Sequence, residues 1–209
     1  MIINIFGKRG AGKTHMIKGL IPLCAKPVII VDVLGNYDDP KYYQSSSASD
    51  TIERLKYYVE TKDDQFSVIV LKTPNPSTDT DYVSAALWHA AGGTLVLDEL
   101  DSISIPESPC FDQLIRYGRN HNVDMITGCR RPAEISKNIT AAGNKMYCFG
   151  TTEPRDVDYF QCTILGDKSP ELMKCPKYSG IFVDYDREII GKFRVDSGGN
   201  VFENNIESL

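Results

Sequence analysis

An apolar run at the start of the chain leads directly into a glycine-rich octapeptide, and this pairing restricts the fold more than any other feature. Residues 2–6 are Ile-Ile-Asn-Ile-Phe, and residues 7–14 are Gly-Lys-Arg-Gly-Ala-Gly-Lys-Thr. The octapeptide matches the pattern G-x-x-x-x-G-K-[ST], and a helical pattern follows it over 13–22. The sequence therefore predicts an α/β protein that begins with a strand, a phosphate-binding loop and a helix.

The chemistry of this loop follows from its residue types. Glycines let the backbone turn so that successive N–H groups converge on phosphate oxygens, and the N-terminus of the next helix adds its dipole. Lys13 is expected to reach the β- and γ-phosphates, and Thr14 is expected to ligate Mg²⁺. We therefore predict that ATP and Mg²⁺ bind to the whole octapeptide, which comprises Gly7, Lys8, Arg9, Gly10, Ala11, Gly12, Lys13 and Thr14.

The rest of the chain alternates between short apolar runs and helical patterns. This alternation is typical of a mostly parallel sheet flanked by helices, because parallel strands are buried on both faces. Strands are expected near 2–6, 27–32, 66–72, 94–98, 123–128 and 145–150. Helices are expected near 13–22, 50–61, 79–91, 108–121, 132–141 and 154–165. The polar stretches 35–50 and 73–81 are expected to be loops.

This order of elements predicts a RecA-like (ASCE) P-loop NTPase fold. Two apolar runs within 179–196 predict a C-terminal β-hairpin that turns at Asp184 to Arg187. The chain has 209 residues, which is enough for one good-sized core. We expect a single domain over 1–196 and a flexible C-terminal tail over 197–209.

A second chemical signal is a pair of acids that follows the apolar run 94–97. Asp98 and Glu99 come at the end of this expected strand, where carboxylates should face the phosphate loop. Asp98 suits a role in holding Mg²⁺, and Glu99 suits a general base that orients the attacking water. A glutamate next to the metal-binding aspartate favours an ATP hydrolase over a kinase. The alternative is that these acids, with Asp101, only solvate a strand end.

Local charge points to further anion contacts. The protein has a net charge of −5, which argues against a protein covered by nucleic acid. The span 115–145 reverses this charge, with six basic residues against two acidic ones. Arg130, or its neighbour Arg131, could sense the γ-phosphate. Arg119, or Arg116, could complete the site of a neighbouring subunit as an arginine finger. Alternatively, these arginines only complement a helix dipole and solvate the surface.

A polar loop with aromatic residues is the candidate nucleic-acid contact. Lys41, Tyr42 and Tyr43 combine a charge that suits phosphate with rings on which bases could stack. An ordinary exposed loop is the alternative.

The six cysteines have no metal-ligand spacing, so they are expected to be reduced and mostly buried. No apolar stretch is long enough for a membrane span and the start lacks the marks of a signal peptide, so a cytosolic protein is expected.

Together these motifs resemble the FtsK–HerA superfamily of DNA-pumping ATPases. The resemblance rests on the phosphate loop, Asp32-x-x-Gly35-x-Tyr37, Leu97-Asp98-Glu99, Arg119-Asn120-His121 and the run Arg-Arg-Pro-Ala-Glu-Ile at 130–135. The superfamily usually has Gln-Arg-Pro in that last run. Arg130 occupies the place of the glutamine, which contacts the γ-phosphate or water, so here it would be a charged substitute.

Within the superfamily, the short length and the motif Gly-Thr-Thr-Glu-Pro-Arg at 150–155 resemble the genome-packaging ATPases of membrane-containing icosahedral viruses and related phages. The resemblance implies an ATP-hydrolysing homopentameric or homohexameric ring that moves double-stranded DNA into a capsid. Portal or vertex proteins of the capsid would be its partners. It would act in the host cytoplasm or at a capsid vertex of the virion.

An alternative within the same resemblance is a virion-assembly or export ATPase of the filamentous-phage (Zot-like) type, which acts on protein. These proteins share the motifs but normally continue into a membrane segment. No such segment is present in this sequence, so we expect no membrane insertion.

Overall fold

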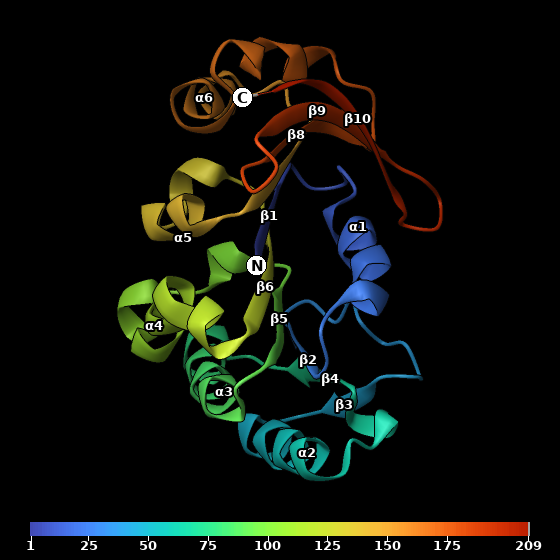
Figure 1. Ribbon diagram of the computed structural model, residues 1–209, viewed down its shortest axis with the longest axis vertical. Coiled ribbons are helices and arrows are strands. Elements are labelled where there is room, and N and C mark those ends of the chain that lie inside the picture. The colour runs from blue at the N-terminus through green and yellow to red at the C-terminus, as the bar shows by residue number, and fades with distance from the viewer. Residues whose placement is uncertain (209) are drawn as a thin grey trace. The chain divides into compact units, whose positions relative to one another are not determined.

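The computed structural model describes residues 1–208, which form two compact units. The acidic-tip unit contains Met1 and Leu23–Ile126, and the phosphate-loop unit contains Ile2–Pro22 and the chain from Thr127 onward. Strand β6 (Val123–Cys129) begins in the first unit and ends in the second. Figure 1 shows the elements of both units.

The acidic-tip unit is a parallel sheet covered by helices. Its strands are β2 (Val28–Asp32), β3 (Tyr43–Ser45), β4 (Val68–Lys72) and β5 (Gly93–Leu97), in the order β5-β2-β4-β3. Its helices are α2 (Ala48–Thr61), α3 (Pro76–Ala90) and α4 (Pro109–Tyr117). All pairings within this order are parallel. Helix α3 packs against both α2 and α4 (Figure 1).

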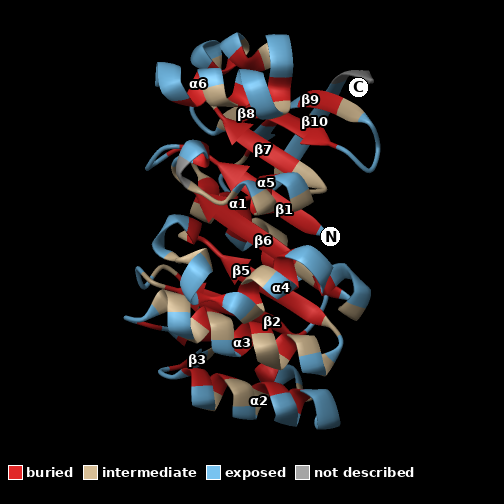
Figure 2. Ribbon diagram, turned by 90° about the vertical axis from the view of Figure 1, so that its left-hand side faces the viewer, coloured by how far each residue is buried: buried red, intermediate tan, exposed pale blue. Residues whose placement is uncertain are grey.

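The central strands of this unit are buried throughout, as Figure 2 shows in red. Their runs of valine, isoleucine and leucine have no polar face, because helices and loops cover both sides of a parallel sheet. Val31 of β2 pairs with Leu97 of β5, so Asp32, the last residue of β2, and Asp98, which directly follows β5, come at the same edge of the sheet. This register places two acids side by side at the carboxyl ends of the strands.

The phosphate-loop unit combines parallel and antiparallel strands. Its strands are β1 (Ile2–Phe6), β7 (Lys145–Phe149), β8 (Ser179–Asp184), β9 (Ile189–Val195) and β10 (Val201–Ser208), in the order β10-β9-β8-β7-β1. Its helices are α1 (Lys13–Leu20), α5 (Lys137–Ala142) and α6 (Pro154–Phe160). The β1/β7 pairing is parallel, whereas the three pairings from β7 to β10 are antiparallel.

The loop between β9 and β10 packs against α1. A Cβ atom built on Gly19 would lie only 2.1 Å from the carbonyl oxygen of Gly199, so only glycine allows this approach. His15 Nε2 lies 2.9 Å from the carbonyl oxygen of Asp196 in the same loop. The C-terminal strands therefore hold the helix that begins at the phosphate loop.

The predicted strands and the predicted hairpin are confirmed, with a turn over 185–188 between β8 and β9. The expected flexible tail 197–209 instead contains β10, which pairs along β9. Polar stretches expected as loops hold more regular structure than predicted. Helix α3 starts at Pro76, because proline suits the first turn of a helix, and β3 and the start of α2 lie within 35–50. A single domain ending at residue 196 stays a prediction.

Candidate nucleotide site

The phosphate loop has the backbone that its glycines allow. Gly10 and Gly12 have φ angles of +78° and +115°, values that residues with a Cβ atom rarely adopt. The N–H of Ala11 donates to the carbonyl of Lys8, and the N–H of Met16 donates to the carbonyl of Gly12, which starts the helix. The loop thus curls tightly before α1, as phosphate binding requires.

Lys13 is buried, and its side chain extends back across the phosphate loop to the first residue of that loop. Its ammonium donates to the carbonyl of Gly7 at 2.7 Å. Thr14 follows as the second residue of α1. An ammonium and a hydroxyl at the start of one helix are the groups that a nucleotide triphosphate and its Mg²⁺ need. Both residues lie at the start of the helix that was predicted after the loop, and their roles in binding stay predictions.

A pocket of about 410 Å³ opens beside the phosphate loop. Lys8, Arg9, Gly10 and Ala11 form one wall, and the motif residues Gly150, Thr151 and Thr152 line another. The segment 172–179 supplies most of the rest. This pocket is large enough for the base and ribose of a nucleotide whose phosphates lie in the loop.

Tyr178 is a pocket residue that the sequence analysis missed. A Cβ atom built on Gly12 would lie 2.8 Å from the Tyr178 ring, so the ring packs directly on the phosphate loop. Tyr178 has a φ of +64°, and the ammonium of Lys177 lies 4.7 Å from the centre of its ring. No sequence pattern marks such a contact, because it joins residues more than 160 positions apart.

Arg130 lies next to the first residue of the phosphate loop. The N–H of Gly7 donates to the carbonyl of Cys129 at 3.1 Å, and Arg130 is the next residue along the chain. Arg131 follows, and its carbonyl accepts a hydrogen bond from the Cys129 thiol. Of the two arginines, Arg130 is the less exposed. This position suits a group that contacts the nucleotide phosphates.

In the acidic-tip unit, a chain of hydrogen bonds leads from Asp32 to Asp98. The Asp32 carboxylate accepts bonds from the backbone N–H groups of Asn36 and Tyr37, which shapes the turn after β2. The φ of Gly35 is +71°, which explains the glycine in this turn. The Tyr37 hydroxyl then donates to the Asp98 carboxylate at 3.2 Å. The motif Asp32-x-x-Gly35-x-Tyr37 therefore supports the predicted metal-binding acid.

The environment of Tyr37 keeps it in the donor form. Burial raises the pKa of its hydroxyl well above 10, and the negative charge of Asp98 raises it further. The hydroxyl therefore stays protonated over the working range of most proteins. As a donor it fixes the position of the Asp98 carboxylate, which is itself buried.

The other predicted catalytic residues of this unit differ in exposure. Glu99 directly follows Asp98 and is partly exposed, so it is accessible to water. Arg119 is exposed in the short 3₁₀ turn Gly118–His121 that follows α4, where it is accessible to an outside partner. Arg116 is held by Asp112 on the same helix, with 2.8 Å between the two side chains. Of the two finger candidates, Arg119 is therefore the better placed.

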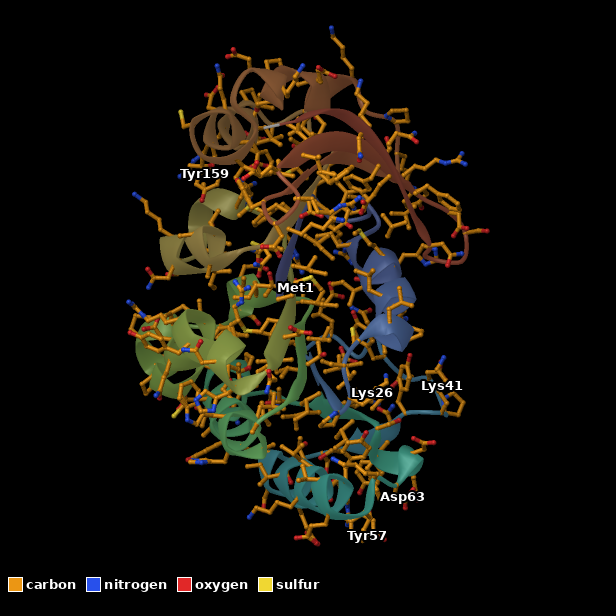
Figure 3. All side chains as sticks on the ribbon, viewed as in Figure 1. Met1, Lys26, Lys41, Tyr57, Asp63 and Tyr159 are labelled. Atoms are coloured by element: carbon orange, nitrogen blue, oxygen red, sulfur yellow. The ribbon has the colours of Figure 1, made fainter. Side chains whose placement is uncertain are left out.

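The predicted nucleic-acid loop offers fewer contacts than expected. Tyr42 is buried, and the Tyr43 ring packs on Phe66 at 5.0 Å while its hydroxyl bonds to Asp50. Lys41 points outward, as Figure 3 shows, and pairs with the neighbouring Asp39. Stacking of bases on Tyr42 and Tyr43 is not supported, because both rings already pack within the protein.

Two of the predicted site residues, one in each unit, have oxygen groups of the kind that Mg²⁺ prefers. Thr14 supplies a hydroxyl and Asp98 supplies a carboxylate, and both are the hard oxygen ligands that Mg²⁺ prefers. Among residues 1–208, apart from side chains not described, no cluster of three or more His, Cys, Asp or Glu could form a metal cage. A Mg²⁺ ion bound by either residue would therefore take nucleotide phosphates and water as most of its ligands, which is its usual mode.

The fold is similar to that of solved genome-packaging proteins. The NTPase B204 from Sulfolobus turreted icosahedral virus 2, in complex with ATP-γS, matches with a TM-score of 0.73 and 17% identity, over 91% of this chain and 95% of B204. B204 from Sulfolobus turreted icosahedral virus, a DNA-packaging ATPase, matches with a TM-score of 0.72 and 16% identity over the same shares.

A conjugation protein also shares the fold. The bacterial conjugative coupling protein TrwB, lacking its first 70 residues, matches with a TM-score of 0.64 and 10% identity, over 91% of this chain and 84% of TrwB. No protein-family model matches the sequence, and no curated protein is similar enough to match it either. The predicted α/β P-loop NTPase fold is confirmed by these similarities. Within the described residues, no helix has the length and apolarity to cross a membrane.

Proposed function

We propose that this protein is an ATP-hydrolysing motor that moves double-stranded DNA into a viral capsid. The observation that carries the proposal is the phosphate loop: residues 8–11 of its curled backbone line an open pocket, and its buried Lys13 donates to the carbonyl of Gly7. The fold similarity to a genome-packaging NTPase supports the choice of DNA packaging. ATP is the proposed nucleotide, and Mg²⁺ the proposed metal.

Each site residue has a role in this proposal. The loop 7–14 binds the phosphates, and the pocket beside it takes the base and ribose. Thr14 and Asp98 hold Mg²⁺, which neutralises charge on the β- and γ-phosphates when bound. Glu99 accepts a proton from the attacking water, and Arg130 stabilises charge on the γ-phosphate.

The proposed assembly is a homopentameric or homohexameric ring at a capsid vertex, where portal or vertex proteins are its partners. The motor works in the host cytoplasm and stays with the virion only through that vertex. Arg119 supports the ring because it is exposed beyond α4, where it can enter the site of a neighbouring subunit. An arginine finger of this kind is worth about 10³–10⁵ in rate.

The function is tested by measuring ATP turnover with and without duplex DNA at low salt. The motor is expected to hydrolyse ATP faster when DNA is present, because translocation couples the two. Equal rates with and without DNA would remove the main support for a DNA motor. Stimulation by a coat protein instead would favour the virion-assembly or export alternative.

The shared site is tested by mixing two inactive proteins. Arg119→Ala removes the finger, and Lys13→Ala removes nucleotide binding. In a mixed ring some interfaces regain an intact Lys13 and an intact Arg119, so some turnover should return. Turnover that stays absent at every mixing ratio, with ring formation verified by particle mass, would argue against a finger supplied by Arg119.

A further inference from the structure

A basic face on the C-terminal strands is a better candidate for DNA contact than the loop at 41–43. In β9, residues alternate between buried and exposed, with Phe193 and Val195 buried and Lys192 and Arg194 exposed. Successive side chains of a strand point to opposite faces, so both cations lie on one face. Their cross-strand partners on β10 are Asn204 and Phe202, which are also exposed.

This face borders a groove of about 570 Å³. Lys192 and Arg194 line it from β9, and Lys174 lines it from the end of the 3₁₀ segment Gly166–Lys174. Asn204 adds a neutral polar group. Glu171 is the one carboxylate among the described lining residues, so the groove carries three cations against one anion in a protein whose net charge is −5.

The single acid is already engaged. Lys192 contacts Glu171 at 2.8 Å, and this hydrogen bond lowers the pKa of Glu171. The charges of Lys168 and Lys174 lower it further. Three lysines thus surround one carboxylate, and the local field remains positive. Such a field attracts an anionic partner with several charges in a row.

The arrangement of Arg194 favours a phosphate backbone over stacked bases. The Arg194 guanidinium carbon lies 5.1 Å from the centre of the Phe202 ring and covers one face of it. A guanidinium held on an aromatic ring is preorganised to offer its N–H groups to a phosphate. Because the Arg194 guanidinium occupies that face of the Phe202 ring, the pair suits contact with the phosphate backbone of a duplex and not stacking with an unpaired base.

The groove also adjoins the nucleotide pocket. Both are lined by Cys175, Pro176 and Ser179, so the two share a wall. Lys174, Lys192 and Arg194 do not line the nucleotide pocket themselves. A partner seated in the groove would press on the segment that also carries Tyr178, whose ring packs on Gly12.

We propose that the groove formed by Lys174, Lys192 and Arg194 binds the phosphate backbone of duplex DNA and is the surface through which DNA stimulates turnover. This inference rests on the proposed DNA motor and assigns its DNA contact. The contact is independent of base sequence, because only charge and backbone geometry are read.

The test compares two triple variants in duplex-binding titrations over a range of salt. In the groove variant, Lys174, Lys192 and Arg194 become alanine. In the control, Lys18, Lys137 and Arg187 become alanine, which removes three exposed cations of the same unit that lie outside the groove. Each lost phosphate contact should lower the slope of log affinity against log salt by about 0.9.

For the groove variant, the slope of log affinity against log salt is expected to be smaller by about 2 to 3, and the affinity for duplex at low salt about tenfold or more lower. It should keep its turnover without DNA and lose the stimulation by DNA. The control variant should match the unmodified protein. A groove variant that binds duplex and responds to it as the unmodified protein does would overturn the assignment.

A second variant should raise the affinity for duplex instead of lowering it, and a folding defect would not cause such an increase. Glu171→Gln removes the one acid among the described residues that line the groove, and it should strengthen duplex binding and steepen the salt slope. Unchanged or weaker binding would contradict the proposal. If the unmodified protein neither binds duplex nor responds to it, the proposed motor fails as well. If the unmodified protein binds duplex and responds to it, and the groove variants do so equally well, the proposed motor stands and the groove is the wrong surface.

Discussion

The phosphate loop and the acidic strand tip reach their geometry by different routes. The loop is built from eight consecutive residues, and its main contact, from Lys13 to Gly7, spans six positions. The acidic tip depends on Asp32, Tyr37 and Asp98, whose last contact spans 61 positions. A local site can be recognised from a short pattern, whereas a non-local site needs the sheet to bring its members together. The two regions should therefore respond differently to substitution.

The largest effect is expected from Lys13→Ala in the phosphate loop. The change removes the buried ammonium that is proposed to contact the phosphates, so both ATP binding and stabilisation of charge in the transition state should be lost. We expect kcat/KM for ATP to fall by about 10⁴, from a loss of roughly 10² in ATP affinity and roughly 10² in kcat. Calorimetric ATP titration and phosphate release measure the two parts. Tight ATP binding by this variant would show that the loop is not the phosphate site.

Glu99→Gln should distinguish the roles of the two regions most clearly, because it should lower turnover and leave ATP binding unchanged. Without a general base, turnover should fall by about 10³, while ATP affinity stays close to that of the unmodified protein, because the loop is intact. Asp101→Asn is the matched control, since Asp101 is exposed two positions further on. Turnover that survives Glu99→Gln would instead favour a nucleotide switch or a kinase-like protein.

Gly12→Ala tests the contact that joins the loop to its pocket. Alanine at a φ of +115° is strained, and its Cβ would lie 2.8 Å from the Tyr178 ring. We expect ATP affinity to fall about 10- to 100-fold, from about 1–3 kcal/mol of strain. Gly10→Ala is the control, because it has a positive φ but no atom within 4 Å, so it should lose less.

The cause of the Gly12→Ala effect can be tested by adding Tyr178→Ala. Removing the ring relieves the collision and leaves only the backbone strain, so the double variant should recover part of the lost affinity. A double variant that binds ATP no better than Gly12→Ala would mean that Tyr178 does not press on the loop.

The smallest predicted effect is that of Tyr37→Phe at the acidic tip. It removes one hydrogen bond to Asp98, worth about 1.5 kcal/mol for a charged acceptor, so turnover should fall about tenfold. The loss should be greatest at low Mg²⁺ if Asp98 serves the metal. Tyr43→Phe removes a hydroxyl bonded to Asp50 instead and should not change the Mg²⁺ dependence. Turnover is measured against Mg²⁺ concentration for both variants and the unmodified protein. The same Mg²⁺ dependence in all three would show that Tyr37 does not support the metal site.

Sequence alone predicted the parts of the fold that depend on local pattern. Most of the strands are continuous apolar runs, and the phosphate loop is a spacing of glycines with Lys13 and Thr14, so both could be predicted directly. Strand β10 was missed because Val-Phe-Glu-Asn-Asn-Ile-Glu-Ser is mostly polar and has a register shift between Asn205 and Glu207. Its pairing is decided by β9, not by its own pattern.

Side-chain contacts between distant positions could not be predicted. Nothing near Tyr178 in the sequence indicates that its ring meets Gly12, and nothing near Tyr37 indicates that its hydroxyl meets Asp98. The same limit applied to Tyr42 and Tyr43, whose polar surroundings suggested exposure although Tyr42 is buried and the half-buried Tyr43 packs its ring on Phe66. The alternation that creates the basic face of β9 was visible, but the groove beside it was not.

The central claim is that one nucleotide and its metal join the phosphate loop to the acidic tip. The most direct measurement is a crystal structure with a slowly hydrolysed ATP analogue and Mn²⁺, located by its anomalous scattering. The account predicts phosphates within the loop 7–14 and a metal that contacts Thr14 and lies within one water of Asp98, with Glu99 facing the γ-phosphate. A metal remote from Asp98, or a nucleotide bound elsewhere, would contradict it.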